Sequence, residues 1–125
     1  MKAIVTICSK PKDNSNKDMP AYLRYTSPRI KEVMEIASKE NAAYFILSGK
    51  FGLIKHDKPI SFYDHLLLDK EINEIAKLVS RQILDNNIDA IDFYAKPKLG
   101  DWITYYKVIE RATNTAEASL NICLL

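Results

Sequence analysis

The sequence predicts an α/β protein: a single three-layer domain over residues 1–125, with a mainly parallel four-stranded sheet and helices on both faces. Three observations carry this prediction. Short apolar runs, typical of strands buried on both faces, alternate with segments whose apolar residues recur at helical spacing. Strands and helices in this alternation form parallel sheets with right-handed crossovers. A chain of 125 residues is also the size of one compact domain with a sizeable core.

Each expected element has a local sequence signal. The four strands are apolar runs bounded by polar or turn-forming residues, at residues 2–7, 43–47, 90–95 and 120–125. Three helices lie between them and begin near residues that cap helix N-termini, namely Ser27, Asp69 and Asp101. Two stretches without periodicity, 11–20 and 54–68, are expected to be irregular connections. The aromatic residues of the last helix are expected to pack in the core.

Composition and charge favour an ordinary globular protein. Hydrophobic residues make up 47% of the chain, and the formal net charge of +2 is too small to indicate nucleic-acid binding by itself. The apolar runs are much shorter than the ~20 residues that span a bilayer, so no membrane partner is expected. Without a secretory signal, and with Cys8 and Cys123 expected to be reduced, a cytoplasmic location is expected. No His or Cys cluster has metal-ligand spacing, so neither a metal nor a cofactor is expected.

The first expected strand ends in the turn Cys8-Ser9-Lys10, at the edge where parallel sheets bind ligands. An ammonium close to a thiol favours the thiolate, so Cys8 is a candidate nucleophile, with Ser9 and Lys10 as candidate anion-binding residues. A small buried cysteine that ends a strand is an equally good interpretation of Cys8. A low-molecular-weight phosphatase is excluded, because its loop needs an arginine where this chain has Asn14.

The second expected strand ends in a glycine-containing turn, residues 48–53. Gly49 and Gly52 permit positive φ or close approach of the backbone to a ligand, and free N–H groups in such a turn bind anions. Ser48 adds a hydroxyl and Lys50 an ammonium. The spacing G-x-x-x-x-G-K-[ST] is absent, so this is not a nucleoside-triphosphatase loop. A tight turn without a ligand is the alternative interpretation.

Two further segments supply polar candidates. Tyr25 and Ser27 precede the first helix, whose N-terminus would attract a phosphate or a carboxylate in the same crevice. A helix cap alone also explains this segment. Tyr63, Asp64 and His65 follow the second turn, and an aspartate beside a histidine suits acid/base chemistry or binding of ribose hydroxyls. A solvated pair in a loop is the alternative.

Four ordered motifs resemble those of a family of small uncharacterised bacterial and phage α/β proteins. In this chain they are Cys8-Ser9-Lys10, Tyr25-Thr26-Ser27-Pro28, the turn of residues 47–53, and the segment from Pro59 to Asp64. The family's motifs read approximately Cys-x-x-Lys, Leu-Tyr-x-Ser-Pro, Leu-Ser-Ala-Lys-x-Gly-Leu and Pro-Tyr-Asp. This chain departs from them in having Gly49 for alanine and Phe62 for proline, and Lys10 and Lys12 flank the position of the family's lysine.

More distantly, the pattern is similar to the domain of archaeosine synthase that handles a deazaguanine base in transfer RNA, and to uracil-DNA-glycosylase-like α/β folds. This resemblance implies a small-molecule nucleotide or nucleobase as ligand, with nucleic acid as a second class of partner. It implies no established reaction.

The leading hypothesis is a cytoplasmic enzyme that acts on a nucleobase or nucleotide by glycosidic cleavage or base modification. Its candidate catalytic residues are Cys8, Ser48 and Asp64. Its candidate binding residues are Ser9, Lys10, Tyr25, Ser27, Gly49, Lys50, Gly52 and Tyr63. A non-catalytic module that binds a nucleotide or another anion in the same crevice is one alternative, and a structural or interaction protein is another. The oligomeric state is left open.

Overall fold

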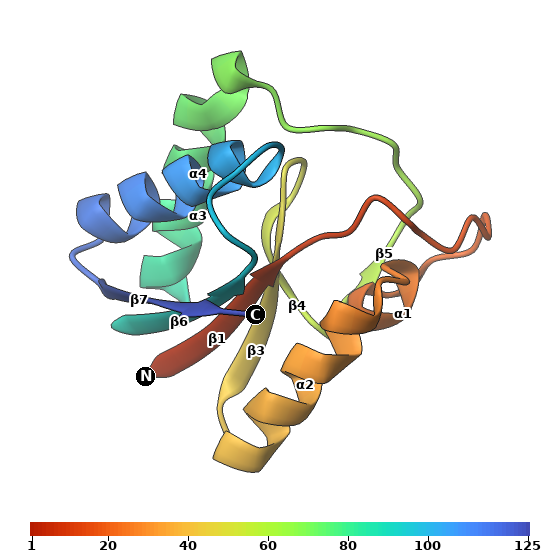
Figure 1. Cartoon of the computed structure of the whole chain (residues 1–125), viewed down its shortest axis with the longest axis horizontal. Helices are drawn as coiled ribbons and strands as arrows, with labels where there is room; N and C mark the ends of the chain where they lie inside the picture. Colours follow the sequence, from red (N-terminus) through yellow and green to blue (C-terminus); the bar gives the residue numbers. More distant parts are fainter.

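A computed structural model describes residues 1–125 as a mixed α/β fold built on one central sheet (Figure 1). The strands of this sheet lie in the order β4-β3-β1-β6-β7. They are β1 (Lys2–Ile7), β3 (Ala43–Ser48), β4 (Gly52–Lys55), β6 (Ala90–Ala95) and β7 (Ser119–Leu124). A separate antiparallel ribbon pairs β2 (Met19–Pro20) with β5 (Pro59–Ile60).

Four α-helices and one 3-10 turn complete the chain. They are α1 (Ala21–Arg24), α2 (Pro28–Glu40), the 3-10 turn η1 (Asp69–Glu71), α3 (Ile72–Asp85) and α4 (Trp102–Thr115). The β-α-β-α-β-α-β order expected from the sequence is present in β1, α2, β3, α3, β6, α4 and β7. Those four strands pair in parallel. No helix combines the length and the apolar character needed to cross a membrane.

The prediction of four strands is wrong, because the sheet has five. The fifth strand, β4, runs antiparallel to β3 and pairs Ser48 with Gly52 across a tight turn. It spans the end of the expected turn (residues 48–53) and the first two residues of the stretch 54–68 that was expected to be irregular. The backbone reverses here because Gly52 has φ +70, a conformation that side chains other than glycine rarely adopt. Four residues are too few for a strand pattern to be recognised beside such a turn.

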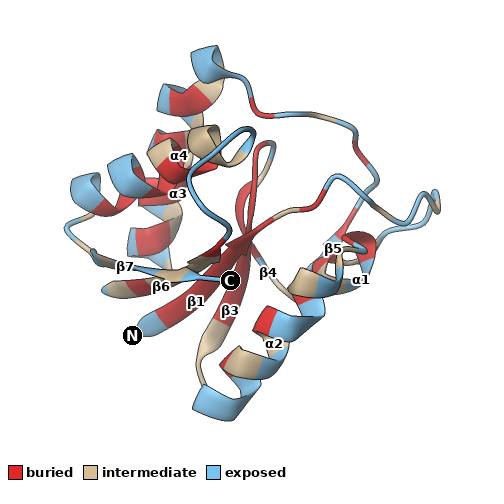
Figure 2. Cartoon of the chain, viewed as in Figure 1, coloured by how far each residue is buried: buried red, intermediate tan, exposed pale blue.

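Side chains alternate between two apolar clusters on opposite faces of the sheet. Val5 and Phe45 point to the larger cluster, which includes apolar residues of α3 and α4. Ile4 and Ile46 point to the smaller cluster, which includes residues of α2. Figure 1 shows α2 on one side of the sheet and α3 with α4 on the other, and Figure 2 shows the buried strands between them. Helices therefore cover both faces, with β4 and β7 at the edges.

The helix starts are close to the expected residues, but the capping interactions differ. Ser27 and Asp101 occupy the N-cap positions of α2 and α4, yet neither side chain makes a capping hydrogen bond. Asp69 lies in η1 rather than at the start of α3. There the Glu71 carboxylate accepts the backbone N–H of Leu68 at 2.9 Å. The polar residues therefore indicated where the helices begin, although their side chains do not cap the helix N-termini.

The stretch 11–20, expected to be an irregular loop, is held in place by a buried arginine. Arg24 is fully buried, and its guanidinium donates to the carbonyls of Asp13 (2.7 Å), Ser15 (2.9 Å), Lys17 (2.6 Å) and Ile60 (3.2 Å). No carboxylate pairs with this guanidinium. One arginine therefore fastens the loop that follows β1 to the ribbon of β2 and β5.

The order in which strands are added to the sheet reverses at β1. The chain leaves β1 through α2 to β3 on one side, and later returns through α3 to β6 on the other side of β1. Connections on opposite faces diverge at the carboxyl end of such a strand, and ligands of open α/β sheets bind in the resulting crevice. This topology points to the end of β1 as the place to look for a site.

Candidate functional site

A cavity of about 480 Å³ opens at the carboxyl end of β1. Its walls come from the turn after β1, the start of α2, the segment between β5 and η1, and the start of α4. Its volume is typical of small-molecule pockets. Ser27 and Asp101, the N-cap residues of two long helices, both line it. The partial positive charge of two helix N-termini therefore adds to the field of the cavity.

Arg29 is a largely buried cation in the cavity wall. Its guanidinium donates to the Thr6 hydroxyl at 2.9 Å and to the Ile7 carbonyl at 2.6 Å, and it lies 5.0 Å from the centre of the Trp102 ring. Burial lowers the pKa of Arg29, but no carboxylate forms an ion pair with it. The arginine is thus fixed to the end of β1 and forms no ion pair with a carboxylate of the protein.

The two lysines of the first loop have different surroundings. Lys10 forms an ion pair with Asp101 at 2.5 Å, so its charge is neutralised within the protein. Lys12 has no carboxylate partner, and its ammonium lies 5.0 Å from the ring centre of Tyr63 and 5.9 Å from that of Tyr25. An isolated backbone bridge between Lys12 and Tyr25 holds the loop there. Lys12 is therefore the better placed of the two for binding an anion.

Ser48, Tyr63 and Tyr25 form a buried chain of hydroxyl groups. Ser48 Oγ lies 2.8 Å from Tyr63 Oη, which lies 2.5 Å from Tyr25 Oη. Ser48 Oγ also accepts the backbone N–H groups of Lys50 at 3.0 Å and Phe51 at 3.1 Å. All three side chains of the chain are at most 5% exposed. Burial raises the pKa of both tyrosines far above the usual range, so both hydroxyls stay protonated at neutral pH.

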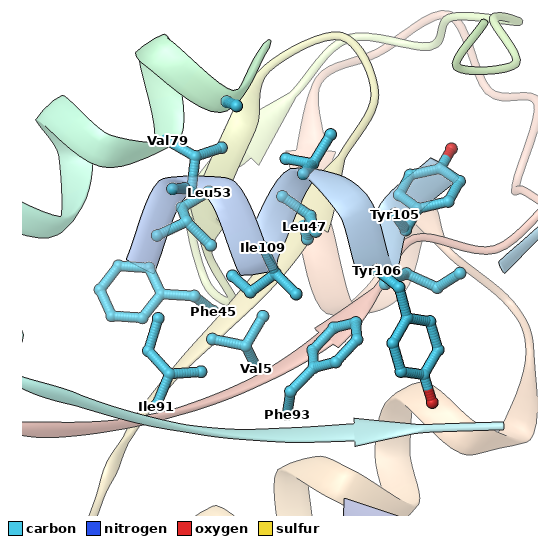
Figure 3. Close-up of a cluster of buried hydrophobic side chains, with 14 of the residues drawn as sticks. Val5, Phe45, Leu47, Leu53, Val79, Ile91, Phe93, Tyr105, Tyr106 and Ile109 are labelled. Carbon is cyan, nitrogen blue, oxygen red and sulfur yellow. The ribbon is translucent and has the colours of Figure 1, made fainter. Parts of the chain in front are cut away.

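Cys8 lies beside a third tyrosine, Tyr105. Its sulfur is 3.6 Å from Tyr105 Oη, and the half-buried side chain packs against the apolar clusters on both faces of the sheet. Burial, followed by the nearby Cys8, raises the pKa of Tyr105. Figure 3 shows that the hydroxyls of Tyr105 and Tyr106 point in opposite directions from α4. That of Tyr106 donates to the Lys96 carbonyl at 2.6 Å, whereas that of Tyr105 reaches Cys8.

A second cavity, also of about 480 Å³, is lined by the segment that contains Tyr63 and Asp64. Gly49 and Lys50 line it together with those two residues. The Lys50 ammonium lies 5.6 Å from the Tyr63 ring centre and, like that of Lys12, has no carboxylate partner. Two unpaired ammonium groups thus flank one buried tyrosine ring.

Asp64 and His65 line both cavities but do not contact each other through a hydrogen bond. His65 Nε2 instead lies 3.0 Å from each carboxylate oxygen of Glu71. The backbone N–H of Leu68, then His65, lowers the pKa of Glu71. Asp64 has no hydrogen-bond or ion-pair partner, so its carboxylate is available to a ligand. The other histidine, His56, stacks on Tyr44 with ring centres 5.6 Å apart and is half-buried.

The two glycines of the second turn serve packing. A Cβ on Gly49 would lie 2.8 Å from Leu67 Cβ and 3.2 Å from Tyr105 Oη. A Cβ on Gly52 would lie 2.4 Å from Gln82 Oε1, and the Gln82 amide binds both sides of this turn through Leu53 N and Phe51 O. Both glycines are thus approached closely by the protein itself.

The residues expected to share one crevice are distributed over two cavities and a buried layer. The first cavity is lined by Cys8, Ser9, Lys10, Ser27 and Asp64, and the second by Gly49, Lys50, Tyr63 and Asp64. Ser48 and Tyr25 are buried beneath the surface, and Gly52 packs against Gln82. Ser9 uses its hydroxyl to bind the Pro11 carbonyl at 2.7 Å.

The sequence interpretation did not assign Arg29, Trp102 or Tyr105 to the site, although all three line the first cavity. Arg29 follows directly on the expected start of the first helix, and the two aromatic residues were expected to pack in the core. Tyr105 is indeed buried, and Trp102 is half-buried. Their place in the sequence could have indicated this, because α4 follows β6, and the end of β6 lies beside the end of β1.

Fold and site together define an α/β protein with a cationic, small-molecule-sized cavity at the switch point of its sheet. No cluster of three or more metal-ligating side chains accompanies it. The chain belongs to the DUF6884 family, a family of unknown function, whose sequence profile matches residues 4–122. Searches of curated proteins and of solved structures find no match to this chain.

Proposed function

We propose that this protein binds a nucleotide or nucleobase in the cavity at the end of β1, with the phosphate at Arg29 and Lys12. The observation that carries this proposal is the guanidinium of Arg29, which is fixed at the end of β1, has no carboxylate ion-pair partner and lies 5.0 Å from the centre of the Trp102 ring. An uncompensated positive charge in a half-enclosed cavity favours an anionic ligand. Trp102 offers an aromatic surface on which a base can stack.

Asp64 supports the choice of a nucleotide over a simple anion. Its free carboxylate lines the same cavity as Arg29 and accepts hydrogen bonds from ribose hydroxyls or base amino groups. A nucleotide supplies both a phosphate for the cationic side chains and hydrogen-bond donors of the ribose or base for Asp64. The cytoplasmic location is part of the same proposal, and both cysteines are free.

Catalysis by glycosidic cleavage or base modification is the second candidate function. Cys8 and Asp64 favour it, because both line the first cavity and neither is committed to an ion pair. Ser48 does not suit the role of nucleophile, since it is fully buried and already binds two backbone N–H groups and Tyr63. If a ligand binds but no product forms, the protein is a non-catalytic binding module.

A thermal-shift screen of nucleobases, nucleosides and mononucleotides tests the proposal. A mononucleotide at about one hundred times its Kd is expected to stabilise the protein by about 2.7 kcal/mol, which raises Tm by roughly 10 °C for a domain of this size. Matching nucleosides should stabilise it less, because they lack the phosphate. A panel in which no compound raises Tm would contradict the proposal.

Two lysine variants localise the binding. Lys12→Gln is expected to weaken mononucleotide binding about tenfold, the effect of losing one hydrogen bond to a charged group. Lys39→Gln removes an equal charge from the exposed far end of α2 and should leave binding unchanged. Equal mononucleotide affinities of the two variants would show that Lys12 is not part of the binding site. Product analysis of the same mixtures tests the catalytic candidate.

A further inference from the structure

Two lysine ammonium groups converge on the ring of Tyr63 from two different loops. The Lys12 ammonium, from the loop after β1, lies 5.0 Å from the ring centre, and the Lys50 ammonium, from the turn after β3, lies 5.6 Å from it. The two nitrogen atoms are therefore no farther apart than the sum of these distances. That sum is close to the Debye length of about 10 Å at 0.1 M salt, so salt screens the repulsion between the two charges only in part.

The protein fixes both lysines to the same buried frame. Ser48 Oγ accepts the backbone N–H of Lys50 at 3.0 Å, and the same oxygen lies 2.8 Å from Tyr63 Oη. Tyr63 Oη lies 2.5 Å from Tyr25 Oη, and the Tyr25 backbone forms the isolated bridge with Lys12. The buried chain of hydroxyl groups thus connects the backbone of one lysine to that of the other. The two ammonium groups are therefore held near each other by the fold.

The cations that line the two cavities outnumber the carboxylates available to them. Asp101 forms an ion pair with Lys10, and the Glu71 carboxylate lies 3.0 Å from His65 Nε2. The charged groups that remain without an ion-pair partner are three cations and one carboxylate, namely Arg29, Lys12, Lys50 and Asp64. An anionic ligand would balance the positive charge that Asp64 leaves uncompensated.

These cations do not all line the same cavity. Arg29 lines the first cavity and Lys50 the second, while Asp64 lines both, so the two cavities share a wall. Lys12 lines the first cavity, and its ammonium lies over the ring of Tyr63, which lines the second. A ligand that contacts both Arg29 and Lys50 therefore has to carry anionic groups in both cavities.

We propose that Lys12 and Lys50 together bind a second phosphate group, beside the phosphate placed at Arg29, so that the ligand is a nucleotide with at least two phosphates. A phosphate between the two ammonium groups replaces their repulsion with two attractions, and lysine binds phosphate as a point charge that needs no fixed geometry. This inference rests on the proposed function, because it extends the same site. A nucleoside diphosphate and a 5′-phosphorylated dinucleotide both carry two phosphates, and the experiment separates them.

Isothermal titration calorimetry of the whole protein compares a nucleoside monophosphate with the diphosphate and the 5′-phosphorylated dinucleotide of the same base. At least one of the two larger ligands is expected to bind about fivefold more tightly than the monophosphate, which is the effect of one exposed ion pair. Lys50→Gln should abolish this preference and leave the affinity for the monophosphate unchanged. The ligand whose preference depends on Lys50 identifies the source of the second phosphate.

Lys55→Gln is the matched control. It removes an equal charge from an exposed lysine at the end of β4 that lies away from the turn, and should change none of the affinities. Lys50 is also exposed and its side chain makes no hydrogen bond, so both variants should fold like the wild type.

Inorganic pyrophosphate separates this inference from the proposed function. If nucleosides contribute nothing to binding, the proposed function fails, but pyrophosphate should still bind about fivefold more weakly to Lys50→Gln than to Lys55→Gln. The second phosphate site is overturned if Lys50→Gln keeps the wild-type affinity for pyrophosphate and for both larger nucleotides, or if it weakens the monophosphate equally. It is also overturned if Lys55→Gln has the same effect as Lys50→Gln. Mononucleotide binding that survives these results leaves the proposed function standing.

Discussion

Replacing Arg24 with methionine tests whether one buried side chain holds the loop that carries Lys12. Arg24 donates to four carbonyls, of which only that of Ile60 is a fully buried contact. Water can replace the arginine at the three loop carbonyls, so the buried carbonyl dominates the loss, at about 1–3 kcal/mol. Methionine preserves most of the apolar stem, and removal of an unpaired buried charge offsets part of the loss. We expect a net destabilisation of about 2 kcal/mol.

Urea unfolding measures this effect, and limited proteolysis shows where it acts. Arg24→Met should lower the urea midpoint and should speed cleavage by trypsin after Lys12 and Lys17, which lie in the released loop. Arg81→Met is the control, because Arg81 is exposed on α3 and makes no hydrogen bond or ion pair. The reasoning is refuted if Arg24→Met changes stability by less than about 0.5 kcal/mol, the usual range of a surface substitution, and leaves the loop uncleaved.

Three further predictions concern packing and titration. Gly49→Ala should lower the free energy of unfolding by about 1–3 kcal/mol in urea, since the new Cβ would lie 2.8 Å from Leu67 Cβ. Gly100→Ala, with open space around it, should cost only about 1 kcal/mol through its positive φ. The raised pKa values of Tyr25 and Tyr63 mean that the folded state holds their protons more tightly, so stability should be constant below the unfolded pKa of about 10 and fall as pH rises above it. A flat urea midpoint from pH 9 to about 12 would contradict this. The lowered pKa of Glu71 has the opposite sign, so the stability difference between wild type and Glu71→Gln should be present above pH of about 4.3 and disappear as pH falls further.

The parallel part of the sheet and its helices could be predicted because the spacing of apolar residues along the sequence is enough to recognise these elements. Each of the four parallel strands has six residues, and β1 and β3 are largely apolar and buried, while α2 and α3 carry clear apolar stripes. The hairpin partner β4 was missed because its four residues follow a glycine turn that itself ended the pattern. The ribbon of β2 and β5 has only two residues in each strand, so it leaves no periodic signal.

Part of the cavity lining could be predicted because strand ends can be located from the sequence. Cys8, Ser9 and Asp64 do line the cavity at the end of β1. The depth of a side chain, by contrast, depends on contacts between distant segments. Ser48 and Tyr25 are buried because Tyr63, from a segment without regular structure, folds back between them. Such a contact has no local sequence signal.

The most direct test of the central claim is a nuclear magnetic resonance titration of the protein with the mononucleotide that raises its Tm most. The account predicts that the backbone amides of residues 8–12 and 27–29 and those at the start of α4 shift on binding, because these segments form the cavity walls. It also predicts that Lys12→Gln reduces these shifts at equal ligand concentration. Shifts confined to other parts of the chain, or none at saturating nucleotide, would contradict a nucleotide site at the end of β1.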